Sequence, residues 1–160
     1  MKTTVATLDD TDRKIIELLQ VDGRMTHAAL GAAVGLTAPS VFERVRKLEQ
    51  RGVIKGYSAI IDPRAVGKPL TAFIRLTTTD DERYDEGVQA LRDDPDILEC
   101  FHVAGEDCFL IKTKVHDPGE LEDVLRRIRT LITVQRSVTM IAISTVKEHG
   151  AVLPAVLTDD

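Results

Sequence analysis

The chain has 160 residues, of which 43% are hydrophobic and 29% are charged, and its formal net charge is −5. This composition suffices for an ordinary globular core and argues against a disordered chain. No apolar run reaches the roughly 18 residues of a membrane-spanning helix, and residues 1–8 lack the apolar stretch of a signal peptide. We therefore expect a cytoplasmic protein.

The charge is divided unevenly along the chain. Residues 1–67 carry a net charge of +2, whereas residues 68–160 carry −7. Because a local basic face attracts phosphates even in an acidic chain, the first part remains a candidate for nucleic-acid binding. The small positive excess predicts a modest affinity for each monomer, and therefore binding as an oligomer.

The first elements along the chain are predicted to be helices. Residues 9–20 begin with carboxylates, which suit a helix N-terminus, and place Ile15 and Leu19 on one apolar stripe. Thr26 is a suitable N-cap for a second, shorter helix. That helix should end at Gly35, because glycine adopts the left-handed conformation without steric cost.

A third helix is predicted directly after a short turn. Thr37 is its N-cap, and Pro39 lies in the first turn, where a missing N–H costs nothing. Val41, Val45 and Leu48 repeat at helical spacing and form a buried face. The opposite face is predicted to be polar and basic, with Ser40, Glu43, Arg44 and Lys47. Two helices joined by a turn that contains Gly, the second with such a face, predict a helix-turn-helix.

The segment after the third helix predicts the end of a first domain. Residues 53–62, VIKGYSAIID, are rich in β-branched residues and predict a strand or wing, which would make a winged helix-turn-helix. Two prolines and a glycine follow and predict a linker. The expected divisions are a first domain at 1–61, a linker at 62–69, a second domain at 70–148 and a C-terminal tail at 149–160.

Beyond the linker, strand and helix patterns alternate. A helix is clearest after Asp117, an N-cap that is followed by Pro118 and, at the capping-box position, Glu120. The predicted strands are 70–77, 97–104, 108–115 and 137–146, and the predicted helices are 83–92 and 118–132. This order predicts an α+β fold of the ferredoxin-like βαββαβ type, with helices on one face of an antiparallel sheet.

Apolar residues are expected on both faces of that sheet. Strict alternation in 97–104 places Ile97, Phe101 and Val103 on one face, and Leu98, Cys100 and Ala104 on the other. Helices cover only one face, so the other predicts sheet-to-sheet association between copies of the chain.

At this point the residues resemble a known family. LDDTDRKI, the turn GLT with VFERVRKLE, and RGVIKGY are together similar to the leucine-responsive/asparagine-responsive (Lrp/AsnC, or feast/famine) transcription factors. The second half resembles the amino-acid-sensing (RAM/ACT-like) domain of that family, so the resemblance covers about residues 8–148. It implies a regulator whose winged helix-turn-helix reads double-stranded DNA. It also implies a homodimer that assembles into an octamer, a tetramer of dimers, with an amino acid bound between dimers.

The resemblance matches the DNA-binding surface to Ala38, Pro39, Ser40, Glu43, Arg44 and Lys47. Arg44 and Lys47 have the reach for bases and phosphates, and Ser40 lies near the helix N-terminus. Arg24 and His27 are further candidates for the DNA backbone. Arg46 is a weaker candidate, expected on the flank in a pair with Glu49. The alternative is that these charges merely solvate an exposed helix face.

The effector loop of the family corresponds to Ala104, Gly105, Glu106, Asp107 and Cys108, completed by Ser137 and Thr139 from a neighbouring subunit. Gly105 would let backbone N–H groups face a carboxylate, and Glu106 or Asp107 would bind an ammonium group. The alternative is an ordinary hairpin turn. Many members carry Asp and an aromatic residue where this chain has Cys108-Phe109, and Gly where it has Thr133, so the identity of the effector stays open.

Other kinds of site are less favoured. Cys100, His102, Cys108 and His116 hold metal-binding donors, but their spacing is unlike that of structural zinc sites, so no metal is expected. The two cysteines are expected as free, buried thiols. No phosphate loop or nucleophile elbow is present, so neither an enzyme nor a cofactor other than an amino-acid effector is predicted. Two alternatives remain: a regulatory subunit of an amino-acid enzyme, and a winged helix that binds only protein.

Overall fold

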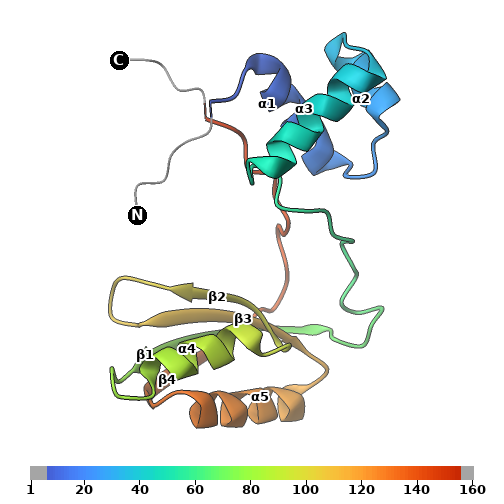
Figure 1. Cartoon of the computed structure of the whole chain (residues 1–160). Coiled ribbons are helices and arrows are strands. Elements are labelled where there is room, and N and C mark those ends of the chain that lie inside the picture. Colours follow the sequence, from blue (N-terminus) through green and yellow to red (C-terminus); the bar gives the residue numbers. More distant parts are fainter. Residues whose placement is uncertain (1–6, 156–160) are drawn as a thin grey trace. The chain divides into compact units, whose positions relative to one another are not determined.

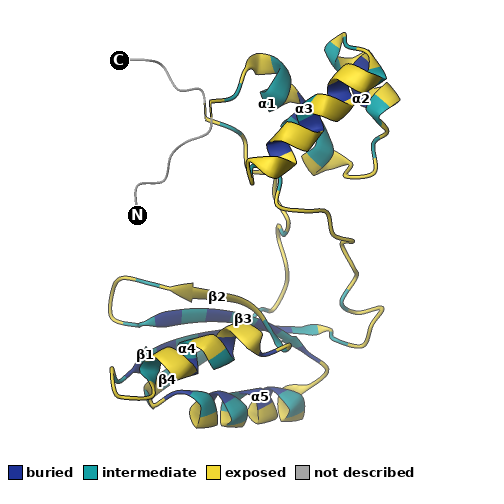
Figure 2. Ribbon diagram, viewed as in Figure 1, coloured by how far each residue is buried: buried dark blue, intermediate teal, exposed yellow. Residues whose placement is uncertain are grey.

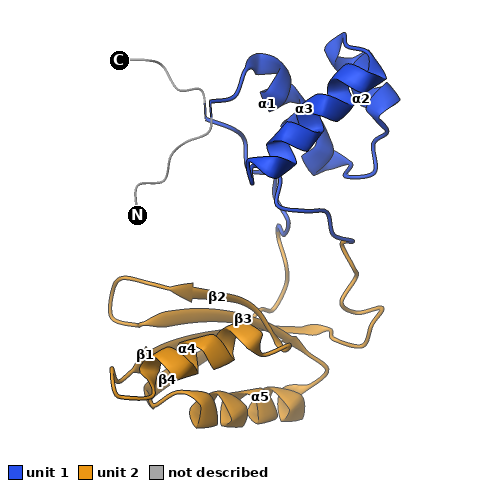
Figure 3. Cartoon of the chain, viewed as in Figure 1, with its two compact units in different colours: residues 1–59, 147–160 blue, residues 60–146 orange. Residues whose placement is uncertain are grey.

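The computed structural model of the chain describes residues 7–155 (Figure 1). The chain divides into two compact units, residues 1–59 with 147–160, and residues 60–146 (Figure 3). Residues 156–160 of the predicted tail and the first six residues of the predicted first domain lie outside the described residues.

The first unit contains the three predicted helices. They are α1 (Asp10–Val21), α2 (His27–Val34) and α3 (Ala38–Gln50). Each begins at a side-chain cap: Asp9, Thr26 and Thr37 accept hydrogen bonds from backbone N–H groups in the following turn. The buried core of this unit consists of Ile15, Leu30, Val41, Val45 and Leu48.

Two glycines fix the turn between α2 and α3. Gly35 ends α2 in the left-handed conformation, with φ of 71°, as predicted. Gly31 is buried, and a Cβ atom there would lie 2.5 Å from the carbonyl oxygen of Leu36. The backbone of α2 therefore approaches the turn more closely than any other residue type would allow.

Residues 53–62 form no strand, so the predicted wing is only an extended segment. The backbone N–H groups of Val53 and Ile54 donate to the carbonyl of Leu48, at 2.9 and 3.2 Å, and so close the end of α3. The Tyr57 hydroxyl lies 3.1 Å from a carboxylate oxygen of Glu49. A strand needs a neighbour for its backbone groups, and β-branched residues alone do not supply one.

The second unit has the predicted βαββαβ order. Its elements are β1 (Leu70–Thr78), α4 (Tyr84–Asp93), β2 (Ile97–His102), β3 (Phe109–Val115), α5 (Pro118–Leu131) and β4 (Val134–Ile141). The strands form one sheet in the order β2-β3-β1-β4, with every neighbouring pair antiparallel. This confirms the ferredoxin-like prediction. The last strand lies earlier than predicted because its pairing with β1 runs from Val134 to Ile141.

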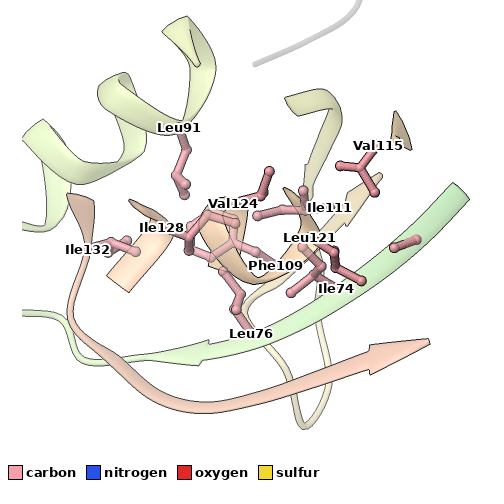
Figure 4. Close-up of a cluster of buried hydrophobic side chains, with 11 residues drawn as sticks. Ile74, Leu76, Leu91, Phe109, Ile111, Val115, Leu121, Val124, Ile128 and Ile132 are labelled. Atoms are coloured by element: carbon pink, nitrogen blue, oxygen red, sulfur yellow. The ribbon is translucent and has the colours of Figure 1, made fainter. Parts of the chain in front are cut away.

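Both α4 and α5 lie against one face of the sheet (Figure 1). Figure 2 shows the buried residues along the inner sides of these elements, and Figure 4 shows the core between them. The two helices pack closely at Gly87, where a Cβ atom would lie 2.8 Å from the carbonyl oxygen of Leu131. The fully buried side chains of the core include Ile74, Leu76, Leu91, Ile111, Val115, Val124, Ile128 and Ile132.

A β-bulge in β2 overturns the predicted alternation. The register shifts between Ile97 and Glu99. Ile97 and Cys100 therefore share the face covered by helices, whereas Phe101, opposite Leu110, lies on the open face. The prediction that Ile97 and Phe101 share a face was wrong because one extra residue inverts every later side chain.

Both cysteines are free thiols, as predicted. Their predicted burial was wrong, since Cys100 is exposed and Cys108 is intermediate. Cys100 lies on β2, which is an edge strand of the sheet. A residue on an edge strand has a neighbouring strand on one side only, which leaves its other side open to solvent.

Candidate DNA-binding surface and effector loop

The outer side of α3 carries mainly polar and charged residues. It lies opposite the buried stripe of Val41, Val45 and Leu48 (Figure 2). Ser40, at the start of the helix, has its hydroxyl 2.9 Å from that of Thr37. The exposed residues of this surface are Pro39, Ser40, Glu43, Arg46, Lys47 and Gln50. We call this set the outer face of α3.

Arg44 does not belong to the outer face. Its Nη1 atom donates to a carboxylate oxygen of Asp9 and to one of Asp12, both at 2.7 Å, and its side chain is 34% exposed. The Asp12 backbone N–H and then Arg44 lower the pKa of Asp9, and the carboxylate of Asp9 raises the pKa of Arg44. Arg44 therefore ties α3 to the first turn of α1 instead of pointing outward.

Arg46 lies where Arg44 was expected. Its Nη2 atom donates to Glu43 at 2.9 Å, and both side chains are about half exposed. The predicted pair with Glu49 is replaced by this pair with Glu43. The signal was present in the sequence: Arg46 follows Glu43 by three positions and shares its face, whereas Arg44 follows the buried Val41 by three.

The two residues proposed near α2 have different surroundings. Arg24 is exposed in the turn before α2, and its backbone N–H donates to Asp22. The ring of His27 meets Phe42 edge to face, with ring centroids 5.4 Å apart. His27 therefore packs against α3 on one side, and its contact with DNA stays a prediction.

The predicted effector loop joins β2 to β3. Its ends are held by backbone hydrogen bonds from Val103 to Cys108, at 2.9 Å, and from Cys108 to Leu76, at 2.7 Å. Gly105 has φ of 149°, a conformation that residues with a side chain rarely adopt, and a Cβ atom there would meet nothing within 4 Å. The backbone at Gly105 is therefore open to an approaching molecule.

The two carboxylates of this loop differ. Asp107 is paired with Arg75, at 2.5 Å, and with Arg136, at 3.3 Å, and its side chain is only 9% exposed. The hydrogen bond from Arg75 lowers the pKa of Asp107 most, followed by the charge of Arg75 and the contacts of Arg136. Glu106 is 87% exposed and lies 4.0 Å from Arg136. Asp107 is therefore held by ion pairs within the chain, whereas Glu106 is open to solvent.

One chain does not bring all the predicted effector residues together. Ser137 lies opposite Leu76 and Thr139 opposite Ile74, so both are on the sheet face covered by α4 and α5. Asp107 is held by Arg75, which lies opposite Val138 on the other face. Within a single chain, the carboxylate and the hydroxyl residues are therefore on opposite faces of the sheet.

The possible metal donors have other contacts. The ring of His102 stacks on Phe109, with centroids 5.0 Å apart, and Nδ1 of His116 is 3.0 Å from the carbonyl oxygen of Gly67. In the described part of the chain, no three His, Cys, Asp or Glu side chains gather as a metal site would require. Nor does any helix between residues 7 and 155 have the length and apolar character to cross a membrane.

Comparison with known proteins matches both units to one family. Residues 8–49 match the AsnC-type helix-turn-helix domain, and residues 71–152 match the Lrp/AsnC ligand binding domain. The chain is 41% identical over 134 residues to the HTH-type transcriptional regulator LrpA of Mycobacterium tuberculosis, covering 84% of this chain and 89% of LrpA. It is 35% identical over 122 residues to the regulator LrpC of Bacillus subtilis, covering 75% of this chain and 83% of LrpC.

Solved structures give the same result. The leucine response regulatory protein LrpA of M. tuberculosis superposes with a TM-score of 0.81 at 39% identity, covering 92% of this chain and 100% of that one. A transcriptional regulator of Neisseria meningitidis in complex with L-methionine superposes with a TM-score of 0.85 at 28% identity, covering 91% of this chain and 96% of that one. These relatives are regulators and not enzymes. On the match of both units and the identity to these regulators, the chain belongs to the Lrp/AsnC family of DNA-binding transcriptional regulators.

Proposed function

We propose that α3 enters the major groove of DNA and that Ser40, Arg46 and Lys47 make its main contacts. The observation that carries this proposal is the outer face of α3, an exposed polar surface on a helix held by a helix-turn-helix. The guanidinium group of Arg46 can donate two hydrogen bonds to one guanine, and the ammonium group of Lys47 suits a phosphate. Glu43 is within reach of a cytosine amino group once Arg46 moves to DNA.

Other predicted contacts take supporting roles in this proposal. Arg24 and His27 lie before and at the start of α2 and would contact the DNA backbone. Ala38 and Pro39 form the first turn of α3, where small side chains let the helix approach the groove closely. Arg44 orients α3 through Asp9 and Asp12, and its role in binding is indirect.

The same proposal divides the chain into functional parts. Residues 1–61 would bind DNA, 62–69 would link the domains, and 70–148 would bind the effector and form the oligomer, followed by the tail at 149–160. A homodimer would place two α3 helices in successive major grooves, about 34 Å apart on one side of the DNA. Higher assembly, up to a tetramer of dimers, would follow. A protein with this role works where the genome is, in the cytoplasm of a bacterium or archaeon.

We further propose an amino acid as the effector. The N. meningitidis regulator and the feast or famine regulatory protein of M. tuberculosis were both solved with L-methionine, the latter with a TM-score of 0.86 to this chain. Residues 104–108 would bind the charged groups of the ligand. Because Ser137 and Thr139 lie on the opposite sheet face, they would have to come from a second copy of the chain.

The DNA proposal is tested by fluorescence anisotropy with the DNA that flanks the gene, from about 50 to about 200 mM salt. Replacing both Arg46 and Lys47 by Ala should weaken binding. It should also reduce the slope of log affinity against log salt concentration, by the equivalent of about two phosphate contacts at most. Arg126→Ala with Arg129→Ala, on exposed positions of α5, is the matched control. An unchanged affinity and slope in the α3 variant would remove α3 from the interface. A regulatory subunit of an enzyme, or a helix that binds only protein, predicts no salt-dependent DNA binding by any variant.

The effector proposal is tested by thermal shift with the standard amino acids, starting with L-methionine. A ligand that binds only the folded state at 100 times its Kd adds about 2.7 kcal/mol and raises the midpoint. Gly105→Ala should reduce this shift, because φ of 149° is strained for alanine. The control is Gly23→Ala in the DNA-binding unit, where a Cβ atom would make ordinary contacts. This variant should leave the thermal shift unchanged.

A further inference from the structure

The chain returns to the DNA-binding unit after the last strand of the sheet. Residues 147–160 group with residues 1–59. The contact involves Gln20, near the end of α1, and Val152. Nε2 of Gln20 donates to the carbonyl oxygen of Val152 at 2.9 Å, and the N–H of Val152 donates to Oε1 of Gln20 at 2.7 Å. We call residues 147–155 the C-terminal segment.

This pair of hydrogen bonds has the form of a strand pairing. A glutamine amide carries a donor and an acceptor side by side, so it engages both backbone groups of one residue at once. Near neutral pH, where carboxyl groups are ionised, Asn and Gln are the side chains that offer this arrangement. Val152 as a whole residue remains 79% exposed, and its hydrogen bonds to Gln20 are made by its main chain.

A groove of about 370 Å³ lies where the segment meets α1 and the extended residues after α3. Its walls are mainly apolar, and Pro154 of the segment forms part of them. Leu19 precedes the anchor Gln20 on α1, and Ile54 and Tyr57 come from the extended residues. The segment therefore forms one wall of an apolar groove, next to its hydrogen-bonded anchor at Gln20.

We propose that the surface formed by α1 and residues 53–57 is the docking site of the chain's own C-terminal segment. Docking makes this segment a second connection between the DNA-binding unit and β4, in addition to residues 60–69. The segment follows β4, which carries Ser137 and Thr139, by only residues 142–146. This part of the inference rests on the proposed function, because β4 matters for regulation only if the effector binds there.

The C-terminal segment then has two states, docked on the DNA-binding unit and released from it. A docked segment limits the freedom of the DNA-binding unit before DNA is bound, so less ordering remains to be done on binding. Releasing it should therefore weaken operator binding. The number of phosphate contacts should not change, because the outer face of α3 is untouched.

Docking is tested by hydrogen exchange and mass spectrometry on the full chain. Gln20→Leu keeps the side-chain size but removes both hydrogen bonds, and Gln20→Glu keeps only the acceptor. We expect the amide of Val152 to exchange roughly tenfold faster in Gln20→Leu, with a smaller change in Gln20→Glu. The matched control is Gln89→Leu, an exposed glutamine on α4. Equal exchange in Gln20→Leu and the parent chain would overturn the docking.

Protection should be independent of protein concentration, because the segment and its site belong to the same chain. Protection that falls on dilution would show that a second copy supplies the segment, and would overturn the proposal in its intramolecular form. Circular dichroism of each variant should match the parent chain. Exposed Gln20 lies at the end of α1, outside the buried core of its unit, so the variants should fold normally.

The DNA consequence is measured by anisotropy with the same variants. Gln20→Leu should weaken operator binding by roughly three- to tenfold with an unchanged salt slope. An unchanged affinity together with faster exchange at Val152 would overturn the role in DNA binding. If the parent chain itself shows no salt-dependent binding, the proposed function fails and the DNA role falls with it, while the exchange result still decides the docking.

Discussion

Arg44 lies beside the apolar stripe of α3, and that position decides what its guanidinium contacts. It follows Val41 by three positions and precedes Leu48 by four, and both of these residues are buried. Its side chain therefore emerges at the edge of the core, where the carboxylates of Asp9 and Asp12 meet it. Two charge-assisted hydrogen bonds fix the angle between α1 and α3.

The first prediction follows from these bonds. Arg44→Ala should lower the stability of the DNA-binding unit by about 1–2 kcal/mol, after discounting for solvent screening at a partly exposed site. Arg46→Ala, whose ion pair with Glu43 is exposed, should change stability by less than about 0.5 kcal/mol. Urea unfolding followed by circular dichroism measures both. Equal stability of the two variants would contradict a structural role for Arg44.

A second prediction concerns the pH dependence of the effector loop. The pKa of Asp107 is held below its ordinary value of 3.8, chiefly by Arg75. Because the folded-state pKa is the lower one, the ion pair contributes fully above pH 3.8 and is lost as the pH falls through the folded value. Asp107→Asn should therefore lower the Tm near neutral pH, and the difference from the parent chain should shrink in acid.

Thermal unfolding by fluorimetry across this pH range measures the difference. Asp123→Asn, at an exposed position of α5, is the control and should change the Tm little at any pH. A difference between Asp107→Asn and the parent chain that persists undiminished well below pH 3.8 would mean that the ion pair does not stabilise the fold.

Among the elements, α2 depends most on its surroundings. With 8 residues it is too short to be stable alone, so its place comes from contact with α3 and the turn. That contact needs glycine at position 31, because a Cβ atom would lie 2.5 Å from the backbone oxygen of Leu36. The distance between α2 and the turn before α3 is thus set by the absence of one methyl group at Gly31.

The third prediction tests this close packing. Gly31→Ala should destabilise the DNA-binding unit by roughly 1–3 kcal/mol, because overpacking outweighs the better helix propensity of alanine. In Gly23→Ala the new Cβ atom would be 3.5 Å from its nearest neighbour, so this variant should be neutral or slightly stabilising. Chemical denaturation of both variants measures the effect. A gain in stability for Gly31→Ala would show that α2 shifts without cost.

At the scale of the whole molecule, one face of the sheet is left uncovered by helices, and this face needs an explanation. Helices α4 and α5 cover one face only. On the other face Phe101 and Met140, which lie on the two edge strands, are 51% and 44% exposed, and Phe73 on the central strand β1 lies opposite Met140. These exposed apolar side chains share the face with the charged Arg75 and Lys112, and they favour association with the same face of a second copy.

The fourth prediction is that Phe101→Asp weakens dimerisation by roughly tenfold or more, because a charge would be buried at the interface. Val66→Asp, at an exposed apolar residue in the predicted linker, is the control and should leave the dimer intact. Sedimentation velocity over a concentration series measures both, with circular dichroism to confirm the fold. A parent-like dimer of Phe101→Asp would place the interface elsewhere.

Local interactions explain what the sequence by itself determined. The caps Asp9, Thr26, Thr37 and Asp117 each bind within their own first helical turn, and Gly35 needs only its own backbone conformation. Apolar spacing decided which helix faces are buried. The order of strands and helices then led to the sheet, and the resemblance of short motifs led to the family. Each of these signals lies within a few residues of the feature that it predicts.

The tertiary structure alone decided the features that join distant residues. Arg44 and Asp9 are separated by 35 positions, and Gln20 and Val152 by 132. The missing strand at 53–62 and the bulge in β2 likewise depend on which strands are available to pair. A side chain's partner is set by the packing of whole elements, and sequence spacing does not contain it. This is why the place of α3 was predictable, whereas the partners of Arg44 and the contact between α1 and Val152 were not.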